Sequence, residues 1–196
     1  MSLDLLLALI GFCFVTSITP GPNNMMLMAS GANFGIRRSL PHMFGISAGF
    51  VVMVTLVGIG LGRLFDIYPV LNTVLKWVSL AYLTWLASKI ARAGEPQARA
   101  PTKPMTFLQA AAFQWVNPKA WGMAISATTT YAPDHSILAA GFVAIVFGAV
   151  NLPSIAFWSL LGQKMRVVLT NRTRLRVFNW TMAALLILSI LPVLWH

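Results

Sequence analysis

Long runs of apolar residues, separated by short polar segments, make up nearly the whole chain. The runs cover residues 3–31, 40–61, 70–90, 107–131, 137–162 and 177–195. Each is about 20 residues long or longer, which is the length that crosses the hydrocarbon core of a bilayer as a helix. The pattern therefore predicts an all-α integral membrane bundle of six transmembrane helices, forming a single domain over residues 1–196.

Composition supports lipid as the solvent. Hydrophobic residues make up 58% of the chain and charged residues only 9%, whereas about a quarter of the residues in a soluble domain are charged. Such a chain cannot cover itself with polar surface. The connectors are short, which leaves no room for a soluble catalytic or receptor domain.

The net charge of +10 is distributed in a way that predicts membrane topology and not nucleic-acid binding. Cytoplasmic connectors are enriched in Lys and Arg, and here the first, third and fifth connectors hold eleven of the fourteen basic residues. These residues are Arg37, Arg38, Lys89, Arg92, Arg99, Lys103, Lys164, Arg166, Arg172, Arg174 and Arg176. We therefore expect these connectors in the cytoplasm and both termini outside.

The chain divides into two halves of three predicted helices each. A charged connector with prolines, about residues 92–105, separates repeat 1 (about 1–91) from repeat 2 (about 106–196). Since three is an odd number, two halves of common origin would have opposite orientations in the membrane, as in many secondary transporters. The sequence thus predicts two inverted three-helix repeats, although residue identity between the halves is weak.

Proline and asparagine interrupt the first predicted helix of each half. The segments are TPGPNN at residues 19–24 and VNPKAW at residues 116–121. Proline lacks an N–H and disturbs helical hydrogen bonding, and the freed carbonyls must face protein or a wet cavity instead of lipid. A single kink is usually a packing feature, but paired breaks at matching positions indicate a substrate site.

We therefore expect a central substrate-binding site made by the two interrupted helices. Its candidate residues are Pro20, Gly21, Pro22, Asn23, Asn24, Asn117, Pro118, Lys119 and Asn151. Lys119 is the most informative of them, because a charge near the middle of a span is costly and usually functional. The alternatives are that its long stem snorkels to the interface and that Asn151 only links helices by hydrogen bonds.

Gly45 and Gly49 form a small-x-x-x-small pair, which we interpret as a helix-packing surface.

Neither a cofactor nor a metal site is expected, because Cys13 is the single cysteine and no two histidines have ligand spacing. The sequence leaves open whether the chain forms homo-oligomers.

Several segments resemble the LysE/RhtB family of amino-acid exporters. The resemblance begins with TPGPNNMMLMASGANFGIRRSLPHMFGISAGF at residues 19–50, where Pro-Gly-Pro precedes a basic pair and a glycine-rich run. It continues through VGIGLGRLF, KWVSLAYLTWLASK and FQWVNPKAW and so covers nearly the whole chain. Ser39 and Ser79 depart from the family pattern, which has glycine there. The resemblance implies export of amino acids or related metabolites from the bacterial cytoplasm across the inner membrane, driven by protons.

The residues themselves favour a neutral or small polar amino acid as substrate. The four acidic residues, Asp4, Asp66, Glu95 and Asp134, all fall at the ends of predicted spans or in connectors, so a cationic side chain would have no buried carboxylate partner. Lys119 and a half-helix N-terminus could hold the substrate carboxylate, and freed carbonyls could hold its ammonium. The alternatives are a small-solute or ion channel and a membrane assembly subunit without transport activity. An enzyme is disfavoured, because no pair of acid–base or nucleophilic groups lies within the spans.

Overall fold

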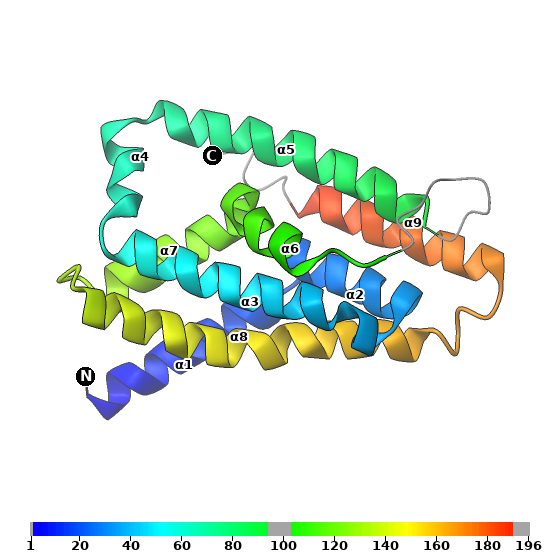
Figure 1. Cartoon of the computed structure of the whole chain (residues 1–196), viewed down its shortest axis with the longest axis horizontal. Helices are drawn as coiled ribbons and strands as arrows, with labels where there is room; N and C mark the ends of the chain where they lie inside the picture. The colour runs from blue at the N-terminus through cyan, green and yellow to red at the C-terminus, as the bar shows by residue number, and fades with distance from the viewer. Residues whose placement is uncertain (1, 94–102, 190–196) are drawn as a thin grey trace.

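The computed structural model describes residues 2–93 and 103–189, and every regular element within these ranges is helical (Figure 1). The helices are α1 (Leu3–Ile18), α2 (Pro22–Phe34), α3 (Ile36–Gly58), α4 (Leu64–Ile67), α5 (Val70–Ala91), α6 (Phe107–Phe113), α7 (Pro118–Tyr131), α8 (Ile137–Met165) and α9 (Arg172–Leu188). Two 3₁₀ turns, η1 (Leu61–Arg63) and η2 (Gln114–Val116), complete the elements. The all-α class predicted from the sequence is confirmed.

Fewer than six helices are individually long and apolar enough to span a membrane. Among the described residues α3, α5 and α8 qualify, and α1 with α2 makes a fourth span if the bent pair counts as one. A break divides the first predicted span into α1 and α2, and another divides the fourth into α6, η2 and α7. The sixth predicted span is represented by α9, which has only 17 described residues. The count of six spans therefore remains a prediction.

The sixth predicted span begins earlier than its apolar run. Helix α9 starts at Arg172 and not near residue 177, because the side chain of Asn171 accepts a hydrogen bond from the backbone N–H of Arg174 and caps the helix. Three of the arginines assigned to the fifth connector, Arg172, Arg174 and Arg176, thus lie in the first turns of α9, whereas Arg166 is the C-cap of α8. The predicted end of this span, beyond residue 189, and most of the connector at 92–105 lie outside the described residues.

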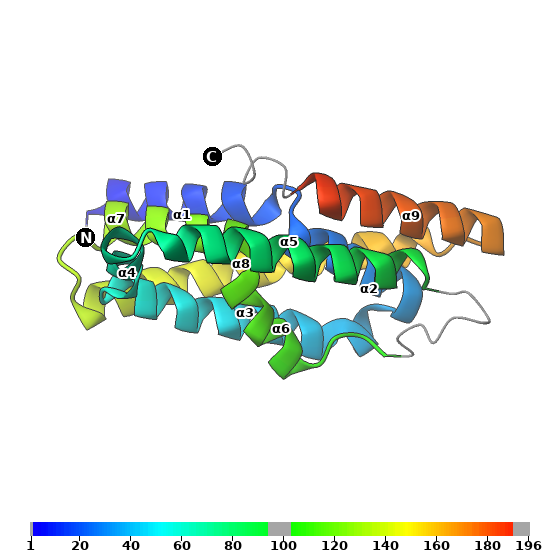
Figure 2. The ribbon, with the colours of Figure 1, turned by 90° about the horizontal axis from the view of Figure 1, so that it is seen from above.

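The bundle is organised around α8, its longest helix. Helix α8 packs against α1, α2 and α3, while α5 packs against α9 (Figure 1). Figure 2 shows α1 and α9 along one side of the bundle and α3 with α6 along the other. The breaks between α1 and α2 and between α6 and α7 lie in the middle of this arrangement.

Two glycines bring α3 close to α6. A Cβ atom at Gly45 would collide with the backbone carbonyl of Phe107, and one at Gly49 would lie 2.6 Å from the Cα of Ala111. The small-x-x-x-small surface of α3 therefore receives the backbone of α6, and this contact holds α6 beside the first half of the chain.

A second pair of glycines brings α2 against α8. A Cβ at Gly31 would meet the carbonyl of Ser159, and a Cβ at Gly162 would meet the carbonyl of Met28. Neither glycine was singled out from the sequence, because the pair lies on two different helices with no recognisable spacing. The close approach holds α2 firmly in place just after the first break.

Candidate functional site

The first break separates α1 from α2 and turns the chain by 56°. Helix α1 ends at Ile18, Gly21 is the N-cap of α2, and Pro22 is the first residue of α2. Proline suits this position, because its missing N–H would have no intrahelical partner there anyway. The break lies where the two prolines predict it.

The carbonyls that the prolines leave free at the end of α1 accept hydrogen bonds from side chains. Because Pro20 and Pro22 cannot donate, the carbonyls of Thr16 and Ile18 lose their usual helical partners. The indole N–H of Trp158 on α8 donates to the Ile18 carbonyl at 3.0 Å. The single proton of the Thr19 hydroxyl is shared between the Val15 carbonyl at 2.7 Å and the Thr16 carbonyl at 3.1 Å. The break is thereby compatible with a position deep in the bundle.

Two further side chains donate hydrogen bonds to carbonyls at the end of α1, and one of them comes from the other half of the chain. Asn24 donates through Nδ2 to the carbonyls of Ser17 (2.9 Å) and Thr19 (2.7 Å). The ammonium of Lys119 donates to the Thr19 carbonyl at 2.7 Å and to the Pro20 carbonyl at 3.4 Å. Because a helix C-terminus carries partial negative charge, the lysine is a favourable partner for it.

The second break has the same construction as the first. Helix α7 begins with Pro118 after the N-cap Asn117, whose side-chain oxygen accepts a hydrogen bond from the backbone N–H of Lys119 at 3.2 Å. In both halves, therefore, a helix that starts with proline points its N-terminus into the same region. Helix N-termini carry partial positive charge and favour anions such as carboxylates.

Side chains also satisfy the carbonyls of the second break. The indole N–H of Trp121 donates to the Trp115 carbonyl at 3.0 Å, and the hydroxyl of Ser79 on α5 donates to the Val116 carbonyl at 2.7 Å. Ser79 is one of the two serines that depart from the family pattern. Its hydroxyl supplies a donor that glycine would not have.

A pair of amides ties the two breaks together directly. Asn23 donates through Nδ2 to Oε1 of Gln114 at 2.9 Å, and Gln114 donates through Nε2 to Oδ1 of Asn23 at 3.2 Å. Gln114 is completely buried and also donates to the Ala110 carbonyl at 2.9 Å. Gln114 was not identified from the sequence, because a single glutamine in an apolar run shows no pattern.

The structure thus brings most of the predicted site residues to one small central space of about 20 Å³. Those that line it are Gly21, Asn23, Asn24, Asn117, Lys119 and Asn151. Pro20, Pro22 and Pro118 shape the breaks without lining the space. Such a volume holds about one water molecule, and the Asn151 Nδ2 and Ser17 Oγ atoms beside it are buried with no partner among the described residues.

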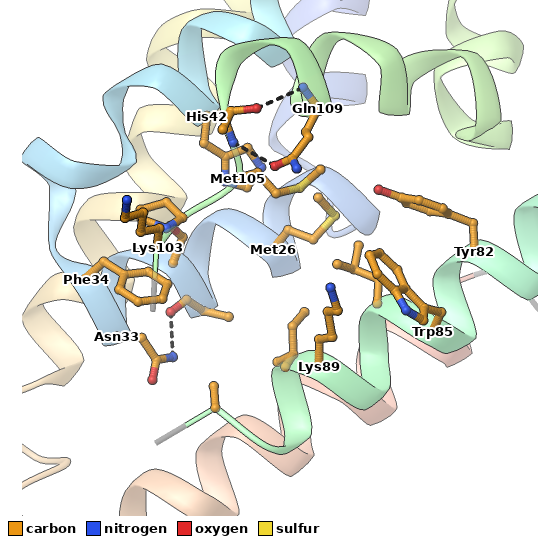
Figure 3. A pocket seen from close by; sticks show the side chains of 17 residues that line it. Met26, Asn33, Phe34, His42, Tyr82, Trp85, Lys89, Lys103, Met105 and Gln109 are labelled. Atoms are coloured by element: carbon orange, nitrogen blue, oxygen red, sulfur yellow. Dashed lines mark hydrogen bonds between the residues drawn. The ribbon is translucent and has the colours of Figure 1, made fainter. Parts of the chain in front are cut away.

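A larger cavity of about 410 Å³ lies farther along α2, and we call it the vestibule (Figure 3). Its lining comes from α2, α3, α5 and the segment that leads into α6. The polar residues of this lining are Ser30, Asn33, His42, Tyr82, Lys89, Lys103, Thr106 and Gln109. Apart from Lys89 and Lys103, which were counted for topology, these residues were not singled out from the sequence.

One signal in the sequence could have revealed the connection between the two spaces. Asn23, Met26, Ser30 and Asn33 follow each other at intervals of three, four and three residues, which places them on one face of α2. Asn23 borders the central space and the other three line the vestibule. This face of α2 therefore runs from one space to the other.

Comparison with known proteins assigns the family. Residues 14–190 match the family described as LysE type translocator. The chain belongs to this family. The resemblance seen in the Pro-Gly-Pro segment and in the segments after it is thus confirmed over nearly the whole length.

Several curated relatives are named as efflux proteins. A cysteine/O-acetylserine efflux protein of Klebsiella pneumoniae subsp. pneumoniae is 28% identical over 190 residues, which cover 95% of each chain. Proteins of the same name from Escherichia coli O1:K1 and from strain K12 are 36% and 35% identical over 132 residues, or 67% of each chain. No solved structure matches the chain.

Proposed function

We propose that the protein exports neutral or small polar amino acids or related metabolites across the bacterial inner membrane and that the proton gradient drives the export. The protein is a member of the LysE family, and one structural observation is the main support for this proposal. Two interrupted helices, one from each half, meet where the ammonium of Lys119 reaches the freed carbonyls of Thr19 and Pro20. Lys119 is half-buried, and convergence of broken helices at a charged side chain is typical of the substrate sites of secondary transporters.

The contacts of Lys119 suggest how an amino acid would be held. Its ammonium occupies the carbonyl cluster that a substrate ammonium would need, and the N-termini of α2 and α7 favour a carboxylate in the same region. In the proposed mechanism the substrate ammonium replaces that of Lys119 at Thr19 and Pro20. Lys119 then turns to the substrate carboxylate. The central space must widen for this exchange, as alternating access requires.

The remaining candidate residues have supporting positions in this mechanism. The amide oxygens of Asn23 and Asn117 already accept hydrogen bonds from Gln114 and from the Lys119 backbone. Asn151 presents an Nδ2 group with no partner in the described part of the chain. We therefore assign Asn151 to direct contact with the substrate, and Asn23 and Asn117 to holding the two breaks in position.

The charges around both spaces support a substrate with an uncharged side chain. None of the described residues that line the central space or the vestibule is Asp or Glu, so a cationic side chain would lack a partner among them. The relatives are named for cysteine and O-acetylserine. Neither side chain is charged at neutral pH, since a thiol has a pKa of about 8.5.

Flux into inside-out proteoliposomes tests the proposal. We expect saturable uptake of labelled O-acetyl-L-serine and L-cysteine that increases when the vesicle interior is acidic, and no uptake of L-lysine. Uptake that stays linear with concentration would instead indicate a channel. Absence of uptake for every amino acid would indicate an assembly subunit.

A further inference from the structure

We propose that the vestibule is a carboxylate-binding site that receives the amino acid before it reaches the centre, with Lys89 holding the carboxylate and His42 contributing a hydrogen bond. The identity of the ligand rests on the proposed function. The site itself rests on the cavity and its side chains. Figure 3 shows Lys89 and Trp85 of α5 projecting into the space that Met26 and His42 border.

The charge of the vestibule selects an anionic group. Lys89 and Lys103 reach the cavity from separate segments of the chain, and none of the described lining residues is acidic. The ammonium of Lys89 lies 3.8 Å from the ring centroid of Trp85. This cation–π contact orients the lysine and leaves its charge available, because the ring does not neutralise it.

His42 provides an independent indication that the cavity is a binding site. Its side chain is only 2% exposed, and neither ring nitrogen has a hydrogen-bond partner among residues 2–93 and 103–189. Buried polar groups nearly always have partners, so an orphaned imidazole that lines a cavity points to a missing one. A carboxylate, hydroxyl or ester oxygen of a ligand would supply that partner after a movement of the neighbouring side chains, because both ring nitrogens are shielded from solvent in this conformation.

The size and walls of the vestibule suit a small amino acid. A volume of about 410 Å³ lies within the range of about 300 to 1,000 Å³ that is usual for small-molecule sites. Met26, Met105 and Trp85 supply apolar and polarisable surface for a short side chain. Thioether groups adapt to irregular ligands and make favourable sulfur contacts.

The vestibule also lies in the right place for a first binding step. Its lining includes Lys89 at the end of α5 and Lys103 before α6, which belong to the basic connector predicted to face the cytoplasm. Its other end is Met26, one helical turn from Asn23 at the central space. An exporter would take up its substrate from this side.

Binding to the purified full-length protein in detergent tests the inference without requiring transport. The probes are O-acetyl-L-serine and 2-aminoethyl acetate, which is the same molecule without the carboxylate. Lys89→Gln should weaken binding of O-acetyl-L-serine by about tenfold to a hundredfold, because a hydrogen bond to a charged group usually contributes that much to affinity. Binding of 2-aminoethyl acetate should not change. The control is Lys164→Gln, which removes an exposed charge near the end of α8 that does not line the cavity.

His42→Leu separates a binding role from a structural one. Removing a polar group that has no partner should leave the thermal midpoint unchanged or higher, while binding of O-acetyl-L-serine weakens. A lower midpoint with unchanged binding would show that the histidine is structural and would remove it from the site.

Three results would overturn the inference. They are no saturable binding of O-acetyl-L-serine to the wild-type protein, equal binding by the Lys89→Gln and Lys164→Gln variants, or an equal loss for both probes. The Lys119→Gln variant should keep binding that depends on Lys89, because Lys119 lies at the other space. Failure of the proposed function would look different: binding would depend on Lys89, but no flux would follow.

Discussion

The side chains of Asn23 and Gln114 exchange two hydrogen bonds, 2.9 and 3.2 Å long, across the place where the two broken helices meet. They are separated by 91 positions in the sequence and belong to different halves of the chain. Each amide satisfies the other, and Gln114 is completely buried. The pair therefore couples the position of α2 to that of η2.

Gln114→Leu should destabilise the protein by about 1 to 3 kcal/mol, because it leaves the Asn23 amide without its partner. The double variant Asn23→Leu/Gln114→Leu should lose less than the sum of the two single variants, since both members of the pair are removed together. Unfolding of the purified protein by denaturant in detergent measures the three values. Strictly additive losses would show that the two amides do not stabilise each other.

Lys119→Gln should fold and insert normally but raise the KM for O-acetyl-L-serine by about tenfold to a hundredfold, since it removes a charge-assisted hydrogen bond. Lys119→Arg should also transport poorly, because guanidinium is planar and larger than ammonium. Flux into proteoliposomes measures both variants. A lysine that only snorkels to the interface predicts nearly normal flux for both, and that result would reject a role in substrate binding.

Gly21→Ala should impair transport more than folding. A Cβ at this position would lie 2.7 Å from Cδ and 3.0 Å from Nζ of Lys119, so the lysine must move away from the carbonyl cluster. The backbone of Gly21 is extended, with φ of −173°, so alanine introduces no backbone strain there. We expect a lower rate of flux with the thermal midpoint almost unchanged.

The matched control for Gly21→Ala is Gly11→Ala in α1. A Cβ at Gly11 would have nothing within 4 Å, and alanine in a helix is favoured over glycine by up to about 1 kcal/mol. This variant should transport normally and be slightly more stable. Equal flux from the two variants would show that the position of the Lys119 side chain does not matter for transport.

Topology can be tested by labelling single cysteines in a Cys13→Ala background. Arg172→Cys should react with a membrane-impermeant maleimide only from the cytoplasmic side, and Asp134→Cys only from outside, because basic connectors remain in the cytoplasm. Both residues are exposed in the structure. External labelling at position 172 would reverse the orientation and would place the vestibule on the outer side.

The sequence alone determined the features that depend on neighbouring residues. Long apolar runs require a membrane-embedded helical chain, and Pro20, Pro22 and Pro118 determine where helices break, because proline affects only the hydrogen bonds of its own turn. The motif around these prolines was enough to recognise the family, which the match over residues 14–190 confirms. The number of spans and the inverted repeat were predicted from the same runs, and they remain predictions.

The tertiary structure decided which groups satisfy one another across the breaks. Lys119 reaches the Thr19 carbonyl, Ser79 reaches the Val116 carbonyl and Gln114 pairs with Asn23. None of these partners could be chosen from the sequence, because each contact depends on how the helices are rotated and shifted against one another. The vestibule depends on the same packing, since its lining comes from segments that are distant in the chain. Local chemistry thus determines where carbonyls become free, and helix packing determines what they bind.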